Sequence, residues 1–367
     1  MKKIFFFLLI FVFFFFPHKT GAQEKPTIST NQYERARVIK VVEDGSNKVE
    51  GITQPFQILE VKILTGKNRG EIFIIDHGKN STIKDYQKVK SGEEIIVLLG
   101  KKGDKDAYLI TDKFRLPSVL LIAIGFFALV IYLAKFKGAS SIIGMIISLL
   151  ILLKFIVPSI AYGKDPVVIS LTGAMAIVFI SIFLAHGFNK RTGIAVVSTF
   201  LTLLISVLLS YLFVELSKLS GSGSEDAYSL QFGTFAGINL KGLLLGGIII
   251  GTLGVLDDIT TAQSAAVDEI SRANPNLTYK ELYNRGLSIG REHIVSLVNT
   301  LILAYAGASL PIFFLFSVLG NAQPLWVTLN SEFIVEEVIR ALVGSTALIL
   351  AVPITTIIAA SFFENKK

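Results

Sequence analysis

Hydrophobic and polar positions divide the chain into three stretches of different pattern. Residues 4–16 form an unbroken apolar run, and residues 23–115 mix charged residues with short or alternating apolar segments. The remainder is dominated by apolar runs of about twenty residues, long enough to cross a ~30 Å hydrocarbon core as helices. The pattern therefore excludes a wholly soluble globular protein and predicts an integral membrane protein.

The first stretch has the layout of an export signal. Lys2 and Lys3 precede thirteen apolar residues, Pro17 ends the run, and the small residues Gly21 and Ala22 follow. Thirteen helical residues are too few to span a bilayer comfortably. We predict a signal peptide over residues 1–22 that is cleaved near Ala22, with an uncleaved anchor as the alternative. In either case the segment that follows is expected to be exported.

Residues 23–115 predict a small exported β domain. Turn residues such as Asp44-Gly45 and Ser91-Gly92 separate short segments with strand character. The expected strands are residues 33–42, 56–64, 71–76, 93–99 and 107–111. Five short strands favour a small closed barrel of the OB-like or SH3-like kind, in which no strand edge is left exposed. Because basic and acidic residues are nearly balanced and aromatic residues are few, we expect a protein partner here and no nucleic acid.

Residues 116–367 predict an all-α polytopic membrane domain with about seven transmembrane helices. The expected helices are residues 117–133, 142–160, 167–185, 194–216, 240–256, 294–316 and 338–362. If the β domain is exported, ten Lys and Arg residues lie in the cytoplasmic pieces and two in the external loops. Membrane proteins concentrate Lys and Arg in cytoplasmic loops. We therefore predict a cell-membrane protein with its N-terminal domain outside the cytoplasm and its C-terminus inside.

The composition of the chain limits the kinds of catalytic and metal sites that it can form. The chain is 52% hydrophobic and 17% charged, with a net charge of +7, four His and no Cys. The absence of Cys excludes disulfides, thiol catalysis and Cys-based zinc sites, and we expect neither a metal nor a cofactor. No nucleophile–His–acid set is apparent, and a DDxxD motif starting at Asp257 would need an acid where the chain has Thr261. An enzyme is therefore not expected.

The fifth predicted membrane helix combines two patterns. Its glycines fit the small-xxx-small spacing that lets helices approach closely, and we expect them to serve helix packing: Gly242, Gly246, Gly247, Gly251 and Gly254. No loop signal follows Leu256, so the helix is expected to continue to Ile270. Its continuation carries acids and hydroxyls along one side: Asp257, Asp258, Thr261, Ser264, Asp268 and Glu269.

Ionisable residues at membrane depth are costly unless they are paired or hydrated, so this acidic stripe is a candidate site for a proton or a cation. The alternative is a helix that leaves the membrane at Asp257, with its acids in cytoplasmic water. Polar residues of the sixth helix are candidates to converge on the acids: Arg291, His293, Asn299 and Thr300. Helix breaks are expected at Pro311 and Pro353.

Three segments together resemble the YibE/F-like family of bacterial multi-pass membrane proteins. They are the run from Gly251 to Ile270, with Asp258 and Glu269, the run from His293 to Pro311, and the run from Arg340 to Thr356. The resemblance covers about residues 33–362 and matches Asp258 and Glu269 better than their acidic neighbours. It implies a permease and no particular substrate. The alternative is a non-transporting anchor, assembly or sensory partner whose exported domain docks another protein. Beyond the lipid bilayer, a second copy of the chain is a candidate partner.

Overall fold

The computed structural model describes residues 32–49, 52–79, 82–102, 105–232, 237–319 and 324–364. The predicted signal peptide, residues 1–22, lies outside these ranges. Two compact units, Lys25–Leu129 and Val130–Lys367, are described separately below.

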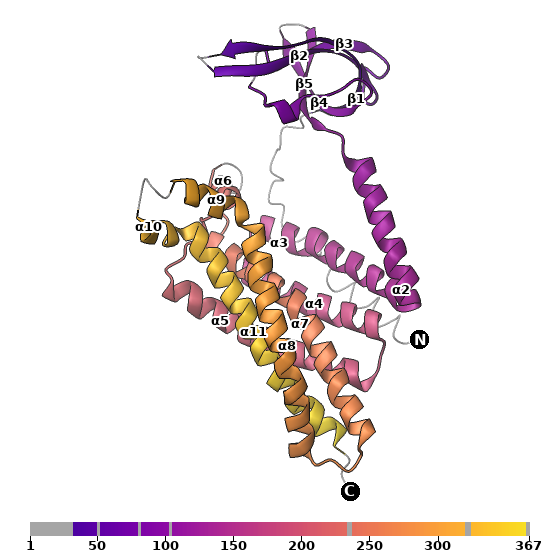
Figure 1. Cartoon of the computed structure of the whole chain (residues 1–367), viewed down its shortest axis with the longest axis vertical. Helices are drawn as coiled ribbons and strands as arrows, with labels where there is room; N and C mark the ends of the chain where they lie inside the picture. Colours follow the sequence, from indigo (N-terminus) through magenta and orange to yellow (C-terminus); the bar gives the residue numbers. More distant parts are fainter. Residues whose placement is uncertain are drawn as a thin grey trace. The chain divides into compact units, whose positions relative to one another are not determined.

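The N-terminal unit contains one antiparallel sheet of five strands in the order β3-β2-β1-β4-β5 (Figure 1). The strands are β1 (Tyr33–Val49), β2 (Ile52–Ile63), β3 (Ile72–His77), β4 (Glu94–Lys102) and β5 (Lys105–Lys113), with a short 3-10 helix, η1 (Asp85–Gln87), between β3 and β4. Irregularities in β1 at Val38/Lys40 and Val41/Glu43 bend this strand, so that it pairs with β4 at its start and with β2 along its length. The five predicted strands are confirmed.

The predicted closed barrel is not confirmed, because the sheet is open. No backbone ladder joins β3 to β5 within the described residues. The two edge strands meet through side chains, with the rings of Phe73 and Tyr108 packed edge to face at a centroid distance of 4.8 Å. Apolar packing at this position replaces the backbone hydrogen bonds that would close a barrel. The two edge strands therefore lack the backbone ladder that was predicted to join them.

The predicted turn at Asp44-Gly45 is wrong, because β1 continues through it to Val49. Gly45 lies opposite Phe56 in the β1–β2 ladder. A Cβ atom on Gly45 would lie 3.0 Å from the Phe56 ring. The glycine is thus explained by an aromatic ring that covers it across the strand pair, and no turn is needed.

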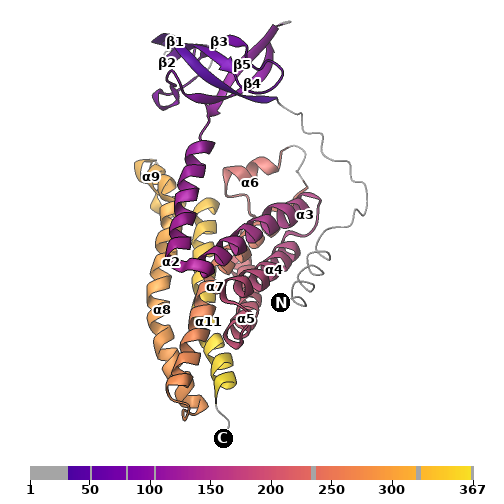
Figure 2. The same ribbon diagram turned by 90° about the vertical axis from the view of Figure 1, so that its right-hand side faces the viewer.

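The second unit is a bundle of helices (Figures 1 and 2). The unit begins within α2 (Leu116–Ile151), whose residues from Val130 onward belong to it. The helices that follow are α3 (Val157–Ala161), α4 (Pro166–His186), α5 (Lys190–Leu216), α6 (Glu225–Leu230), α7 (Leu240–Ala273), α8 (Tyr279–Ala308), α9 (Leu310–Leu319), α10 (Leu325–Leu329) and α11 (Glu332–Phe363). A π-helical segment, η2 (Leu152–Ile156), joins α2 to α3. The long helices begin at polar caps: Asp165 accepts from the Val168 amide, Asn189 from the Thr192 amide, and Thr278 from the Glu281 amide.

Within the described residues, five helical runs are long and apolar enough to cross a membrane: Leu116–Ala161, Pro166–His186, Lys190–Leu216, Leu240–Ala273 and Glu332–Phe363. The predicted count of seven is therefore not confirmed. The first two predicted helices lie within one of these runs, and a kink at Lys135 (φ 52°) divides α2 into two helices between the two predicted segments. The sixth is divided between α8 and α9 at Ser309. By contrast, α11 runs through Pro353 without a break.

Helix α7 lies at the centre of the bundle. It packs against α4, α5, α8 and α11, and Figure 2 shows α8 on one side of it and α4 and α5 on the other. Its buried branched side chains join residues of α5 and α11 in one core cluster that includes Leu253, Leu256, Ala195, Leu203, Ala347 and Ala351. Side chains on the other sides of α7 therefore face a neighbouring helix or the outside of the bundle.

The β domain offers a test through Glu94. Arg35 and Arg37 hydrogen-bond its carboxylate at 2.6 and 2.7 Å and lower its pKa. A lowered pKa stabilises the fold above the unfolded-state pKa near 4, and this contribution is lost as the pH falls through the folded-state pKa. Glu94→Gln should therefore lower the free energy of unfolding of residues 32–115 by about 1 kcal/mol at pH 7. Urea titrations at pH 7 and near pH 3 check this, and an equal difference at both pH values would contradict it.

Candidate functional site

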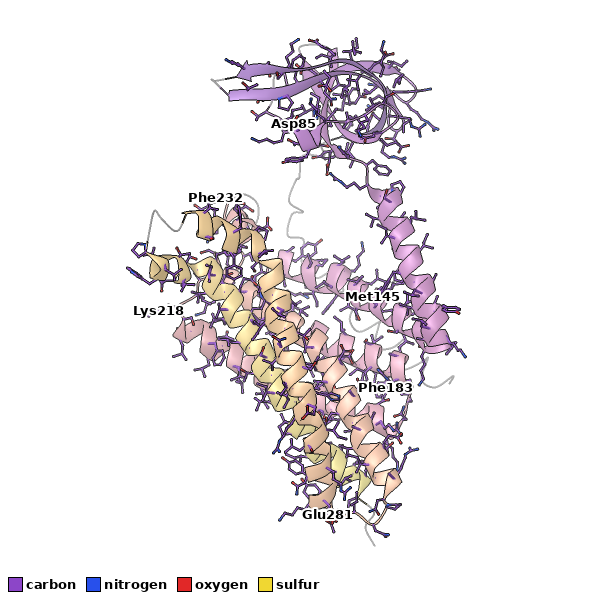
Figure 3. All side chains as sticks on the ribbon, in the orientation of Figure 1. Asp85, Met145, Phe183, Lys218, Phe232 and Glu281 are labelled. Carbon is purple, nitrogen blue, oxygen red and sulfur yellow. The ribbon has the colours of Figure 1, made fainter. Side chains whose placement is uncertain are left out.

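The acidic stripe lies on one continuous helix, as the sequence predicts, because α7 runs from Leu240 to Ala273 without interruption. At 1.5 Å per residue its 34 residues extend about 51 Å, well beyond the ~30 Å of a hydrocarbon core. Figure 3 shows Phe183 and Glu281 towards one end of the bundle and Lys218 and Phe232 towards the other. We call the end that carries Lys190, Arg272 and Glu281 the charged end.

Neighbouring helices divide the stripe into two parts with different surroundings. Nearest the charged end, Asp268 and Glu269 are both bound by Arg191, the second residue of α5. The Arg191–Glu269 contact measures 2.6 Å, and Arg272 adds a contact to Asp268 at 3.1 Å. The Asp268 side chain is only 7% exposed, so its charge is neutralised inside the protein. This part of the stripe therefore ties the start of α5 to α7.

Asp257 and Asp258 lie nearer the middle of α7 and have no such partner. Asp257 is half-buried and accepts one long hydrogen bond, 3.5 Å, from the Ser181 hydroxyl of α4. Asp258 is exposed, and His186 at the end of α4 is close enough for the two charges to interact. Across the described ranges, no Lys or Arg nitrogen comes within 4.0 Å of either carboxylate. No Lys or Arg side chain in these ranges therefore neutralises either acid.

The remaining members of the stripe have local roles. The Thr261 hydroxyl donates to the Asp257 carbonyl oxygen at 2.9 Å, and the Ser264 hydroxyl donates to the Arg191 carbonyl oxygen at 2.9 Å. Both therefore stabilise the helices that carry the acids. Each hydroxyl thus donates to a backbone carbonyl oxygen and not to a carboxylate.

A buried polar junction lies beside the stripe, and sequence reasoning missed it. The Gln263 amide donates to the Gly286 carbonyl of α8 and to Thr356 of α11, both at 2.8 Å. The hydroxyls of Thr199 on α5 and Thr260 on α7 lie 2.7 Å apart. All four side chains are fully buried, so this junction fixes α5, α8 and α11 around α7. The available signal was the presence of these polar side chains, Thr199, Gln263 and Thr356 among them, in helices that are otherwise largely apolar.

The predicted residues of α8 do not contact the acids. Arg291, Asn299 and Thr300 are exposed, and the Thr300 hydroxyl bonds to the Ser296 carbonyl of its own helix at 3.0 Å. His293 is half-buried, and its Nδ1 atom is buried without a hydrogen-bond partner. In place of these residues, Tyr305 reaches α7, with its hydroxyl 3.4 Å from the position of a Cβ atom on Gly251.

Four of the five glycines of α7 separate into two groups, and the fifth, Gly251, lies against Tyr305. Gly242 and Gly246 face α4, where added Cβ atoms would meet Pro166 at 3.2 Å and the Ser170 hydroxyl at 2.5 Å. Gly247 and Gly254 face open space within the protomer, with no atom within 4 Å of an added Cβ. Close helix approach thus accounts for the first pair only.

No group of three His, Cys, Asp or Glu side chains is placed to hold a metal ion in the part of the chain that the structure describes. The arrangement can nevertheless take up a proton or a weakly held cation, since it offers two adjacent carboxylates, a hydroxyl and an imidazole.

The bundle of long apolar helices around α7 defines the chain as a polytopic helical membrane protein. Its sequence matches the model of the family described as YibE/F-like protein over residues 122–365. The chain therefore belongs to the YibE/F-like family. No curated protein matches it. No solved structure matches it either.

The two parts of the stripe should respond differently to neutralisation. Asp268→Asn removes the partner of Arg191 and should lower the free energy of unfolding by about 2 kcal/mol, because a buried ion pair is broken on one side. Asp257→Asn removes an unpaired charge and should leave the free energy of unfolding within about 0.5 kcal/mol of its original value. Unfolding by denaturing detergent measures both. A loss at Asp257 as large as that at Asp268 would show that Asp257 has a structural partner.

Proposed function

We propose that this protein is a permease in which Asp257 and Asp258 bind the transported or coupling cation, with a proton as the simplest candidate. The observation that carries the proposal is the contrast within one helix. Asp268 is neutralised by Arg191 and Arg272, whereas Asp257 is half-buried without a cation. Unpaired carboxylates in a membrane bundle are costly, and they are typical of ion and proton pathways.

The surroundings of the two acids suit binding that is reversible. Ser181 offers a hydroxyl at 3.5 Å, and His186 offers a second titratable group beside Asp258. A fixed Arg would hold the carboxylates permanently ionised and occupied, whereas a hydroxyl and an imidazole permit protonation and release. Arg191 is engaged with Asp268 and Glu269, so it does not compete for Asp257.

The orientation predicted from the sequence indicates which side of the membrane this site is nearer to. With the β domain outside, the charged end of the bundle lies in the cytoplasm, in agreement with the Lys and Arg bias. Asp257 and Asp258 then lie between the middle of α7 and its cytoplasmic end. A cation bound there would have crossed most of the membrane domain or would be about to enter it.

Proton flux into liposomes tests the proposal. The purified chain is reconstituted with a pH-sensitive dye inside, and a potassium diffusion potential drives protons inward. We expect acidification by the unaltered protein and at least about a tenfold slower rate for Asp257→Asn/Asp258→Asn, because the bound charge is lost. Glu215→Gln neutralises an exposed acid at the opposite end of the bundle and serves as the control.

Two results would contradict the proposal. If the unaltered protein carries no proton flux, the proton is not the transported ion. If the double variant carries the same flux as the unaltered protein, Asp257 and Asp258 are not the cation-binding site.

A specific observation also favours the alternative function, docking of a protein by the exported domain. Strand β3 has no backbone ladder on the side opposite β2, and its Ile72 and Ile74 side chains are 55% and 73% exposed. Exposed apolar edge strands add a further strand from a partner or aggregate. The domain also contains a cleft of about 240 Å³ that is lined by His77, Tyr86, Leu109 and Thr111, among others.

Capture by the β domain distinguishes this alternative. Residues 32–115 should retain a partner from membrane extracts, and Ile74→Lys should lose it, because a charge on the edge strand opposes strand addition. Retention of nothing by the unaltered domain would contradict the docking function.

A further inference from the structure

The part of α2 that belongs to the bundle carries a cation without an acidic partner. Lys137 is exposed, and it takes part in none of the ion pairs found in the part of the chain that the structure describes. In the same ranges, Asp257 and Asp258 have no Lys or Arg nitrogen within 4.0 Å. Because unpaired charges are costly in a membrane bundle, the position of this cation relative to the two acids is informative.

The bend in α2 fixes the backbone at Lys137. The chain leaves helical geometry at Lys135 (φ 52°), shortly before it. Gly138 follows and is buried, and a Cβ atom there would lie 2.6 Å from the Val130 carbonyl oxygen. The chain therefore packs closely on its own preceding turn, and this contact requires glycine. The backbone of Lys137 is held by this bend, whereas its long side chain remains exposed.

Contacts with α4 set the depth of Lys137 in the bundle. An added Cβ atom on Gly144 of α2 would lie 3.7 Å from Ser181, and one on Gly173 of α4 would lie 2.4 Å from Ile156 of η2. The segment that contains Gly144 and Ile156 is therefore antiparallel to α4. Lys137 lies about two turns before Gly144, so it is level with the end of α4, about two turns beyond Ser181.

His186, at this end of α4, connects the cation to the acids. It is close enough for its charge to interact with those of both Lys137 and Asp258. Ser181 of the same helix packs against α2 and donates to Asp257 at 3.5 Å. The positive charge of Lys137 is thus near the two acids, and it is not spent on a direct contact with either of them.

The other charged groups around this part of α7 do not supply such a charge. On α5, Arg191 is occupied by the acids nearer the charged end. On α11, no charged residue lies between Arg340 and Glu364. Two groups of opposite charge, both exposed, and a half-buried imidazole come from α8: Arg291, Glu292 and His293. Lys137 is therefore the cation that acts on the acids through α4.

We propose that Lys137 is a fixed counter-charge that lowers the affinity of Asp257 and Asp258 for their cation and so favours its release. This inference rests on the proposed cation site. When the site is empty, the positive charge of Lys137 stabilises the ionised acids, and when the site is occupied, it repels the bound cation. A contacting Arg would occupy the carboxylates permanently, whereas a cation at a distance weakens binding and leaves the acids accessible.

Infrared titration of the reconstituted protein tests the proposal without requiring flux. The carboxylate signal that Asp257→Asn/Asp258→Asn removes is followed against pH. Lys137→Gln should raise the midpoint of this signal by about 0.5 pH unit, which is about threefold tighter proton binding, because a nearby positive charge is lost. Lys137→Glu should raise it about twice as far, and Lys137→Arg should leave it unchanged. These shifts should shrink at high salt, which screens exposed charges.

Lys190→Gln is the matched control, since it removes a cation from the same end of the bundle. The Lys190 ammonium lies 5.8 Å from the centroid of the Phe362 ring. Its neighbour Arg191 binds Asp268, about three turns beyond Asp258 along α7. The control should therefore leave the midpoint unchanged.

Two results would overturn the role of Lys137 alone. The first is a midpoint in Lys137→Gln equal to that in Lys190→Gln. The second is a shift in Lys137→Arg as large as that in Lys137→Gln, because charge would then not be its cause. In both cases the signal still titrates, so the proposed cation site stands. A signal that does not titrate in the unaltered protein would contradict the cation site itself, and the role of Lys137 with it.

Discussion

A carboxylate in a membrane bundle must find a positive partner, water or a proton, and this requirement governs the arrangement around α7. Asp268 meets it with Arg191 and Arg272, and the resulting contacts anchor α5 to α7. Asp257 does not meet it, because its single hydrogen bond comes from Ser181 at 3.5 Å. The proposed function depends on this difference, since an acid neutralised by Arg is part of the structure and an acid without a cation is available for binding.

The fold keeps the unpartnered acids in place through neutral contacts. Gln263 ties α7 to α8 and α11, and Thr260 ties it to α5, all with fully buried side chains. Gly242 and Gly246 bring α4 close enough for Ser181 to reach Asp257. Interhelical hydrogen bonds of this kind are worth only about 0.6 kcal/mol each on average in membranes, so several are needed to fix one geometry. The site is thus held by many weak contacts that leave its charge uncompensated.

Local pattern predicted much of this architecture. The five strands, the continuation of α7 beyond Leu256 and the membership of the YibE/F-like family all follow from short-range signals in the sequence. The predictions of a closed barrel and of a turn at Asp44-Gly45 are not confirmed, because both features depend on contacts between strands. These contacts are Phe73 against Tyr108 and Phe56 over Gly45. The division of the acidic stripe was not predictable for the same reason. Arg191 is 77 residues from Asp268 along the chain, and nothing near either residue indicates the pairing.

Difference infrared spectroscopy of the reconstituted protein tests the central claim most directly, because it observes carboxylate groups themselves. Exchange of the surrounding cation, or a step in pH, should perturb a carboxylate stretching band in the unaltered protein. That perturbation should disappear in Asp257→Asn/Asp258→Asn and persist in Glu215→Gln. A carboxylate signal that is unchanged in the double variant would contradict the claim that these two acids are the free binding groups of the bundle.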